Sequence, residues 1–223
     1  EAIFTSETLS SIKKLTDASW KMPFSSRVDS ITNYQHTWVE EDDLVVENFV
    51  PNPESIRLDR LNELKDIALA EPQLVNYLIS NRAHATAVSV NLNLPELRTE
   101  ADEATVEVVA YSRALRDEIE ADNPNLKIYL IGQTVVNNTF NEMSTQDMTQ
   151  LIPIMFLVIV VLLQVILRSV VGTVSTVIII GMSVLVTQGF MGWVGYAVNQ
   201  VNVMSPIIIL TLAVCDCVHI LNN

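Results

Sequence analysis

The stretch that decides the fold is LIPIMFLVIVVLLQVIL, residues 151–167, which contains no charged side chain. Two more apolar runs follow it, and from residue 150 to the end the chain carries one base, Arg168, and one acid, Asp216. A helix needs about 20 mainly apolar residues to cross a hydrocarbon core of ~30 Å. The sequence therefore predicts that residues 150–223 form an all-α transmembrane segment. The three predicted spans are residues 150–168, 170–191 and 201–221.

The connections between these runs predict how the spans cross the membrane. One or two residues separate the first two runs, so these spans form a tight helical hairpin. Arg168 lies in that hairpin, and the tendency of basic residues to stay inside makes the hairpin cytoplasmic. Residues 1–149 are then extracytoplasmic (periplasmic), and the protein is a multi-pass protein of the inner (plasma) membrane. The alternative, buried helices of a large soluble protein, is disfavoured by the lengths and the absence of charge.

The first 149 residues have the composition of a soluble domain. Of the 26 acids and 13 bases of the chain, all but Asp216 and Arg168 lie here. Such an excess of acid argues against nucleic acid and anionic lipid headgroups as partners. The chain begins at Glu1 without a signal peptide, so an external domain in this position implies that the numbering starts inside a longer protein.

Apolar periodicity predicts alternating helices and strands in this domain. The predicted helices are residues 7–20, 25–33, 54–70, 99–122 and one from about Val135 that runs straight into the first span. The predicted strands are residues 35–40, 44–50, 74–80, 85–94 and 126–132. The middle of this order is strand–helix–strand–strand–helix–strand, which is the split βαβ pattern. We therefore predict an α+β ferredoxin-like extracytoplasmic domain, residues 1–149, followed by the transmembrane helices.

One ionisable side chain at membrane depth, Asp216, is the main functional candidate. A charge there costs roughly 2.5–3.5 kcal/mol on insertion scales, so such residues face a bundle interior or a wet pathway. Spacings of three and four place it on one helical face with other, partly polar residues. That face comprises Asn202, Ser205, Ile209, Leu212, Asp216 and His219. The functional interpretation is a proton relay through Asp216 and His219; the alternative is that Asp216 only fixes packing against another helix.

No other chemistry is indicated by the sequence. Cys215, Asp216 and Cys217 are consecutive and point about 100° apart on a helix, so they do not predict a metal site. The cysteines read as small apolar packing residues. His36 and His84 stand alone in strand-like runs, and no catalytic motif or phosphate-binding loop is present. We predict no cofactor, no metal and no enzymatic activity.

Taken together, the external domain, the LRSVVGT hairpin and the last apolar run resemble the resistance-nodulation-division (RND) superfamily, particularly its MMPL-like and Patched-like exporters. The match to N-x-x-S is Asn202 and Ser205, and the match to D-x-x-H is Asp216 and His219. Two positions depart from the family pattern: Val214 replaces the usual Gly, and Cys217 follows the acid.

This resemblance implies a fragment that covers the first extracytoplasmic domain and spans two to four of twelve, with a second repeat elsewhere in the same chain. It implies proton-coupled efflux with Asp216 as the coupling acid, a bundle that overlaps the sterol-sensing domain of relatives, and hydrophobic or lipid-like cargo in the bilayer. A homo-oligomer is compatible with it. The coupling ion, proton or sodium, and the cargo stay open.

Two functions from different classes remain. The first is a secondary active transporter, a proton-motive-force-driven exporter in which protonation of Asp216 shifts helix packing. The second is a non-transporting membrane receptor or assembly factor, whose external domain binds a partner while the spans anchor it. Loss of activity on neutralising Asp216 distinguishes the first from the second.

Overall fold

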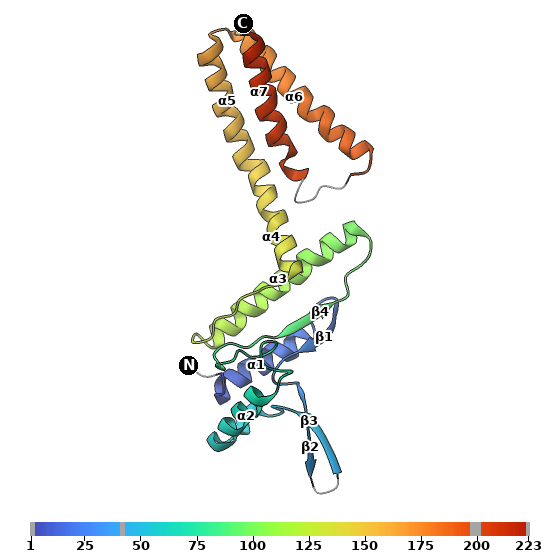
Figure 1. Cartoon of the computed structure of the whole chain (residues 1–223), viewed down its shortest axis with the longest axis vertical. Helices are drawn as coiled ribbons and strands as arrows, with labels where there is room; N and C mark the ends of the chain where they lie inside the picture. The colour runs from blue at the N-terminus through green and yellow to red at the C-terminus, as the bar shows by residue number, and fades with distance from the viewer. Residues whose placement is uncertain (1–2, 41–42, 197–201, 222–223) are drawn as a thin grey trace. The chain divides into compact units, whose positions relative to one another are not determined.

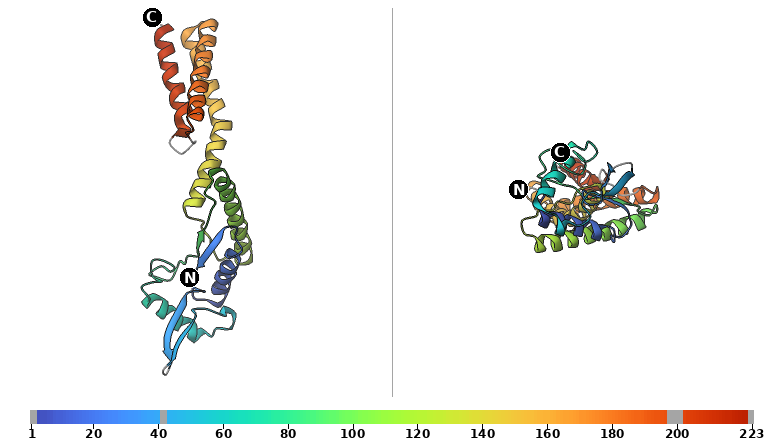
Figure 2. Two further views of the ribbon diagram at one scale, coloured as in Figure 1. Left: turned by 90° about the vertical axis from the view of Figure 1, so that its right-hand side faces the viewer. Right: turned by 90° about the horizontal axis from the view of Figure 1, so that it is seen from below.

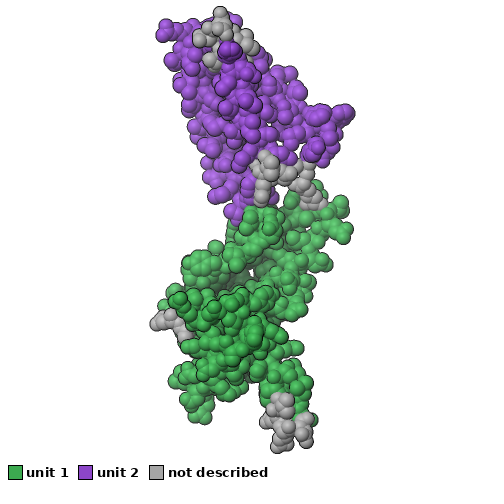
Figure 3. Space-filling view, in the orientation of Figure 1, with its two compact units in different colours: residues 1–138 green, residues 139–223 purple. Residues whose placement is uncertain are grey.

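The structure is a computed structural model that describes residues 3–40, 43–196 and 202–221. It divides into two compact units, Glu1–Asn138 and Thr139–Asn223, coloured separately in Figure 3. This boundary, 138/139, lies about eleven residues before the point at 149/150 where the sequence becomes almost uncharged. The residues between the two points, 139–149, are mostly polar, but they belong to the same long helix as the apolar segment that follows.

The described part of the first unit contains helices joined by loops and four short strands (Figure 1). Its elements are α1 (Ser6–Ser19), β1 (Ser25–Asp29), β2 (Gln35–Glu40), β3 (Asp43–Asn48), the 3-10 turn η1 (Pro53–Ser55), α2 (Leu58–Ala70), β4 (Ser89–Leu92) and α3 (Arg98–Asp122). Thr5 is the N-cap of α1, because its side-chain hydroxyl accepts a hydrogen bond from the Thr8 N–H at 3.2 Å.

The four strands form two separate antiparallel pairs. β2 and β3 make a local hairpin in which Trp38 lies opposite Val45. β1 pairs with β4, which follows it by some sixty residues, and Val28 lies opposite Val90. Val28 is buried while its neighbour Arg27 is exposed, so one face of this pair contributes to the core.

Helices α1 and α3 pack against each other. The Lys14 ammonium lies 2.8 Å from a Glu118 carboxylate oxygen and 2.6 Å from one of Asp122. These hydrogen bonds raise the pKa of Lys14 to about 12. The Tyr111 hydroxyl donates to the Ala18 carbonyl at 2.9 Å, which joins the same two helices further along.

The main core of this unit lies beneath α1, α2 and the turns that follow α2. Its fully buried members include Leu9, Ile31 and Leu74. Beside it is a buried cluster of hydroxyls: Thr16 donates to Ser30 at 2.9 Å, and Ser30 and Thr32 are 2.8 Å apart. Because each hydroxyl has a partner, the cluster is buried without an unmet hydrogen bond.

Several predicted elements of this unit are wrong. Residues 25–33, predicted as a helix, contain β1, because pairing with β4 outweighs local propensity. Residues 74–80, predicted as a strand, form turns joined by isolated bridges, and Asn76 has a left-handed φ of 65°. Residues 126–132 are not a strand: residues 126–131 have no regular secondary structure and pair with no strand among the described residues, and Gly132 has a positive φ of 125°. The single ferredoxin-like sheet is therefore not confirmed.

The second unit is helical throughout its described part (Figures 1 and 2). Its elements are the end of α4 (Gln133–Gln146), the π-helical turn η2 (Asp147–Leu151), α5 (Ile152–Leu167), α6 (Val170–Trp193), the 3-10 turn η3 (Asn202–Met204) and α7 (Ser205–Leu221). The prediction that a helix from about Val135 runs straight into the first apolar run is confirmed, since residues 133–167 form one helix.

Two helices, Gln133–Leu167 and Val170–Trp193, are long and apolar enough to cross a membrane. α7 has 17 residues, fewer than the roughly 20 that span a bilayer, so the third span stays a prediction whose first residue lies outside the described part. Most large apolar side chains of α5 and α6 are exposed, for example Leu157 and Leu185. An apolar surface of this extent suits hydrocarbon and not water.

Candidate functional site

The hairpin between α5 and α6 is as tight as the sequence predicts. Arg168 ends α5 in a left-handed conformation with φ 51°, and its N–H donates to the Gln164 carbonyl at 3.1 Å. Ser169 caps α6 by accepting a hydrogen bond from the Gly172 N–H at 3.2 Å. Two residues therefore reverse the chain, and the one base of the membrane segment lies at this turn.

α5, α6 and α7 pack around a small apolar centre. Its buried members are Leu163 of α5, Ile180 of α6 and Leu210 of α7, one from each helix. Ala213 and Val214 of α7 pack against the same centre. These contacts define which side of α7 faces the other two helices.

A polar contact joins α6 to the start of α7. The Gln188 side-chain amide donates to the Ser205 hydroxyl at 3.1 Å. Ser205 belongs to the predicted polar face, and Asn202, another member, is half-buried in η3. Gln188 was not predicted as part of this site. It could have been found from the sequence, because it is the one amide side chain in the apolar run from Val170 to Met191.

Asp216 and His219 lie near the C-terminal end of α7, one helical turn apart, and both are exposed. They are therefore outside the face formed by Leu210, Ala213 and Val214 that packs on α5 and α6. The structure brings Ser205 against α6 but leaves the Asp216 side chain on an uncovered side of this three-helix unit. At membrane depth, such a carboxyl requires cover from further protein or from water.

The cysteines next to Asp216 do not form a site with it. Cys215 is exposed and is a free thiol, and the side chain of Cys217 lies outside the described part of the chain. Across the described residues, no group of three or more His, Cys, Asp or Glu is close enough to hold a metal ion.

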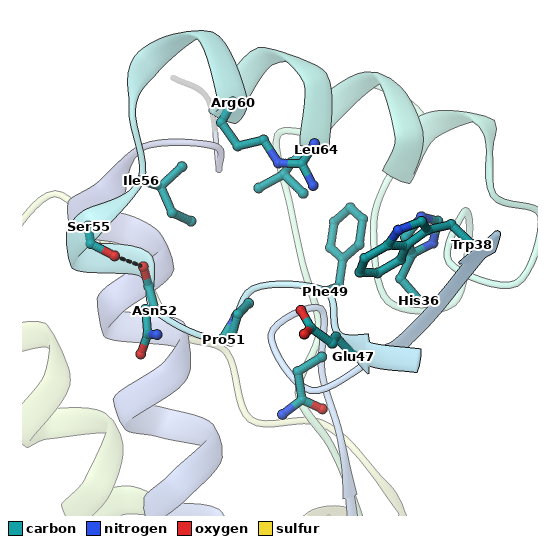
Figure 4. A pocket seen from close by; sticks show the side chains of 11 residues that line it. His36, Trp38, Glu47, Phe49, Pro51, Asn52, Ser55, Ile56, Arg60 and Leu64 are labelled. Carbon is teal, nitrogen blue, oxygen red and sulfur yellow. Dashed lines mark hydrogen bonds between the residues drawn. The ribbon is translucent and has the colours of Figure 1, made fainter. Parts of the chain in front are cut away.

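The first unit has a surface cleft of about 240 Å³ beside the β2–β3 hairpin (Figure 4). It is lined by His36, Trp38, Glu47, Asn48, Phe49, Pro51, Asn52, Ser55, Ile56, Arg60 and Leu64. Its aromatic wall is ordered: the rings of His36 and Trp38 stack at 5.6 Å, and Phe49 meets His36 edge-on at 5.7 Å. Figure 4 shows Arg60 and Glu47 on different sides of the cleft, so it combines an apolar wall with both charges.

The two histidines of this unit have structural partners. His36 packs between the aromatic rings of the cleft wall, a cluster that the sequence reasoning did not find. The sequence does indicate this cluster, because His36 and Trp38 are two residues apart in a predicted strand and therefore lie on the same face of it. The His84 Nδ1 lies 3.0 Å from the Ser80 hydroxyl, within the turns that follow α2.

A comparison with protein-family models matches residues 9–215 to the MMPL family. The match leaves the first eight residues and residues 216–223 outside, so it ends directly before Asp216. No curated protein and no solved structure was found to match. The match spans both units, including the two helices long enough to cross a membrane. The chain belongs to the MMPL family, whose members are RND-type membrane transporters.

Proposed function

We propose that this chain is part of a proton-motive-force-driven exporter of the inner membrane that moves a hydrophobic or lipid-like substrate. Membership of a transporter family supports membrane transport, and not enzymatic catalysis, as its activity. The observation that carries the mechanism is Asp216, the one carboxylic acid in the segment from residue 150 to the end.

The energetic argument concerns the two protonation states of this carboxyl. In the ionised form it costs several kcal/mol at membrane depth, whereas the protonated form costs far less. Taking up and releasing a proton therefore changes which surroundings the end of α7 can occupy. His219, one turn further along the same face, is placed to be the next proton carrier.

The uncovered side of α7 supports a larger bundle around Asp216. Hydrocarbon does not solvate an ionised carboxylate. In this proposal a second repeat of the same protein therefore packs over Asp216 and encloses a water-filled path. Ser205 and Gln188 tie the other end of α7 to α6, which leaves the Asp216 end as the part that can change its packing.

The topology of the proposal follows from Arg168. With this base at the α5–α6 turn, the turn faces the cytoplasm and residues 1–149 lie on the periplasmic side. The ferredoxin-like organisation of that external domain also belongs to the proposal.

The test is transport by the full-length protein carrying Asp216→Asn, an uncharged near-isostere. We expect proton-dependent export to fall to background while the protein still reaches the membrane, and Asp216→Glu to restore part of it. Asp147→Asn, an acid in the polar turn before α5, is the matched control and should leave export unchanged. Undiminished export by Asp216→Asn rules out the relay. Running the assay with a sodium gradient at constant pH identifies the coupling ion.

A receptor or assembly role is favoured by one observation, the exposed apolar side chains of the β2–β3 hairpin. Leu44 is 68% exposed and Val46 is 49% exposed, beside the aromatic cleft. Such a surface suits binding of another protein. In that case Leu44→Asp would abolish activity, and Asp216→Asn would leave it intact.

A further inference from the structure

The β2–β3 hairpin has two different faces. Side chains of paired strands alternate between the faces, and residues directly opposite each other share one. His36 lies opposite Glu47, and Trp38, two residues after His36, lies on the same face. These three side chains line the cleft that the hairpin forms with α2 (Figure 4). The exposed Leu44 belongs to the other face of the hairpin, so the cleft is distinct from the apolar surface around that residue.

The aromatic wall of this cleft is ordered by contacts among its own rings. His36 and Trp38 stack with an interplanar angle of 26°, and Phe49 meets His36 edge-on. Phe49 is buried and belongs to the core of the first unit, so it anchors the end of the hairpin. His36 and Trp38 are half-buried, and part of each ring faces the cleft. A rigid apolar surface of this kind binds a flat ligand with little loss of side-chain freedom.

The polar groups of the cleft supply both hydrogen-bond donors and acceptors. On the α2 side is Arg60, whose Nη1 lies 2.6 Å from a Glu63 carboxylate oxygen. This pair positions the guanidinium, and because a guanidinium has five N–H donors, others remain for a ligand. On the hairpin side is Glu47, whose carboxylate accepts hydrogen bonds. The Ser55 hydroxyl donates to the Asn52 carbonyl at 3.1 Å, so its oxygen is a further acceptor.

The two charges of the cleft disfavour a ligand with one charge. A carboxylate at Arg60 would be repelled by Glu47, and an ammonium at Glu47 would be repelled by Arg60. A neutral molecule with hydroxyl groups uses both side chains, because each hydroxyl donates and accepts. The volume of the cleft, about 240 Å³, is below the roughly 300–1,000 Å³ of sites for drug-sized ligands, so the ligand is a small one.

We propose that this cleft is a binding site for a neutral saccharide ring. A pyranose has a flat face of C–H groups and a rim of hydroxyls. In the proposed complex the C–H face packs on Trp38, while hydroxyls donate to Glu47 and accept from Arg60. The inference is independent of the proposed transport function, because it concerns a cleft within the first unit and assigns no exported cargo.

The first test is saccharide binding by the full-length protein in lipid nanodiscs, since sugar-headed detergents would compete for the site. Saturation-transfer NMR detects the bound ring of methyl glucoside, methyl galactoside or methyl N-acetylglucosaminide. At least one of these should bind with a millimolar Kd, as suits a ligand of a single ring. Methyl glucuronide, which carries a carboxylate, and the zwitterion phenylalanine should bind about tenfold more weakly. No saccharide binding up to about 10 mM, or tighter binding of either charged ligand, overturns the proposal.

The second test locates the bound ring. Arg60→Met keeps the length of the side chain but removes its donors, and it should weaken binding about tenfold, because hydrogen bonds to charged groups are the stronger ones. Trp38→Phe keeps an aromatic ring on the strand and should weaken binding less than Trp38→Ala. Arg57→Met, at an exposed base three residues earlier that does not line the cleft, is the matched control. Equal affinities of Arg60→Met and Arg57→Met overturn the assignment.

The same sugar on a lipid anchor identifies the source of the ring. If a glucosyl lipid in the nanodisc binds no more tightly than methyl glucoside, the ligand is a free saccharide. If the lipid-linked sugar binds about tenfold more tightly, the ligand is a lipid headgroup. Both outcomes support the site when Arg60→Met reduces the binding, and binding that is insensitive to Arg60→Met overturns it.

Discussion

The two units of this molecule place apolar and polar side chains in opposite ways. In residues 1–138, apolar side chains such as Leu9 and Leu74 are buried, and ion pairs such as Lys14 with Asp122 lie at the surface. In residues 139–223, large apolar side chains cover the outside of α5 and α6, and the described part carries a polar link between Gln188 and Ser205 inside. Water drives the first arrangement, whereas lipid provides no hydrophobic gain for helix association.

The difference teaches where each unit obtains its specificity. The water-exposed unit depends on core shape, because burial of apolar surface is its main stabilising term. The membrane unit depends on close packing and on a few interhelical polar contacts, because apolar side chains are as well solvated by lipid tails as by a neighbouring helix. Four substitutions test this contrast, from the largest expected effect to the smallest.

Leu9→Ala should have the largest effect on stability. Leu9 is fully buried on the core-facing side of α1, so its truncation loses transfer free energy and leaves a cavity. We expect the free energy of unfolding of the first unit to fall by about 2–5 kcal/mol, measured by urea titration with tryptophan fluorescence. Leu44→Ala, on the exposed hairpin, should stay within about 0.5 kcal/mol of the parent protein. Equal losses in the two variants would contradict a core centred on Leu9.

Thr16→Val tests the buried hydroxyl cluster. The variant keeps the shape of Thr16 but removes the hydroxyl that contacts Ser30 and Thr32. We expect a loss of about 1–2 kcal/mol in the same urea titration, because buried polar groups lose a partner. Ser55→Ala, whose hydroxyl is exposed, is the control. A neutral Thr16→Val would show that the cluster adds no stability.

Gln188→Leu tests the polar link in the membrane unit. Interhelical hydrogen bonds in membranes average about 0.6 kcal/mol and reach about 1.7 kcal/mol. A double-mutant cycle of Gln188→Leu with Ser205→Ala, measured by unfolding in detergent, should give a coupling energy in that range. Additive effects of the two substitutions would mean that the 3.1 Å contact carries no energy.

Glu120→Gln should have the smallest effect, visible only in acid. The Ile128 N–H and the Lys127 ammonium hold the pKa of Glu120 below its ordinary value of 4.5. A group with a depressed folded pKa contributes stability above its unfolded pKa, and this contribution is lost as pH falls through the folded value. The parent protein should therefore lose stability below about pH 4.5 more steeply than Glu120→Gln. Glu107→Gln, an exposed acid on the same helix, should retain the steep parental slope.

The local features of the fold could be predicted from the sequence because they depend on neighbouring residues. The α5–α6 turn follows from Arg168 and Ser169 between two apolar runs, and α3 follows from its amphipathic pattern. Pairing of β1 with β4 was not predictable in this way, since the partners are some sixty residues apart and β1 reads locally as a helix. The run 74–80 is apolar enough for a strand, yet Asn76 turns the chain there.

The sequence predicts how the candidate residues are spaced along α7, but not which other helices they meet. Asp216 and His219 share an exposed side of α7, as their spacing requires. Periodicity within one helix does not reveal its neighbours, so it missed that Gln188 of α6 binds Ser205. Periodicity also placed Ser205 and Asp216 on one face of α7. In the structure, however, Ser205 contacts Gln188 of α6, whereas Asp216 is exposed.

The π-helical turn at Asp147–Leu151 has a consequence for reading α4 and α5 as one helix. A turn of this kind holds one residue more than an α-helical turn, and it lies where the ring of Pro153 would otherwise meet the carbonyl four residues earlier. Each residue corresponds to about 100° of rotation. A helical wheel drawn with one period from Gln133 to Leu167 would therefore misplace the lipid-facing side of α5 by more than a quarter of a circle. Removing one residue from the turn would rotate that side by the same angle and expose different side chains to the bilayer.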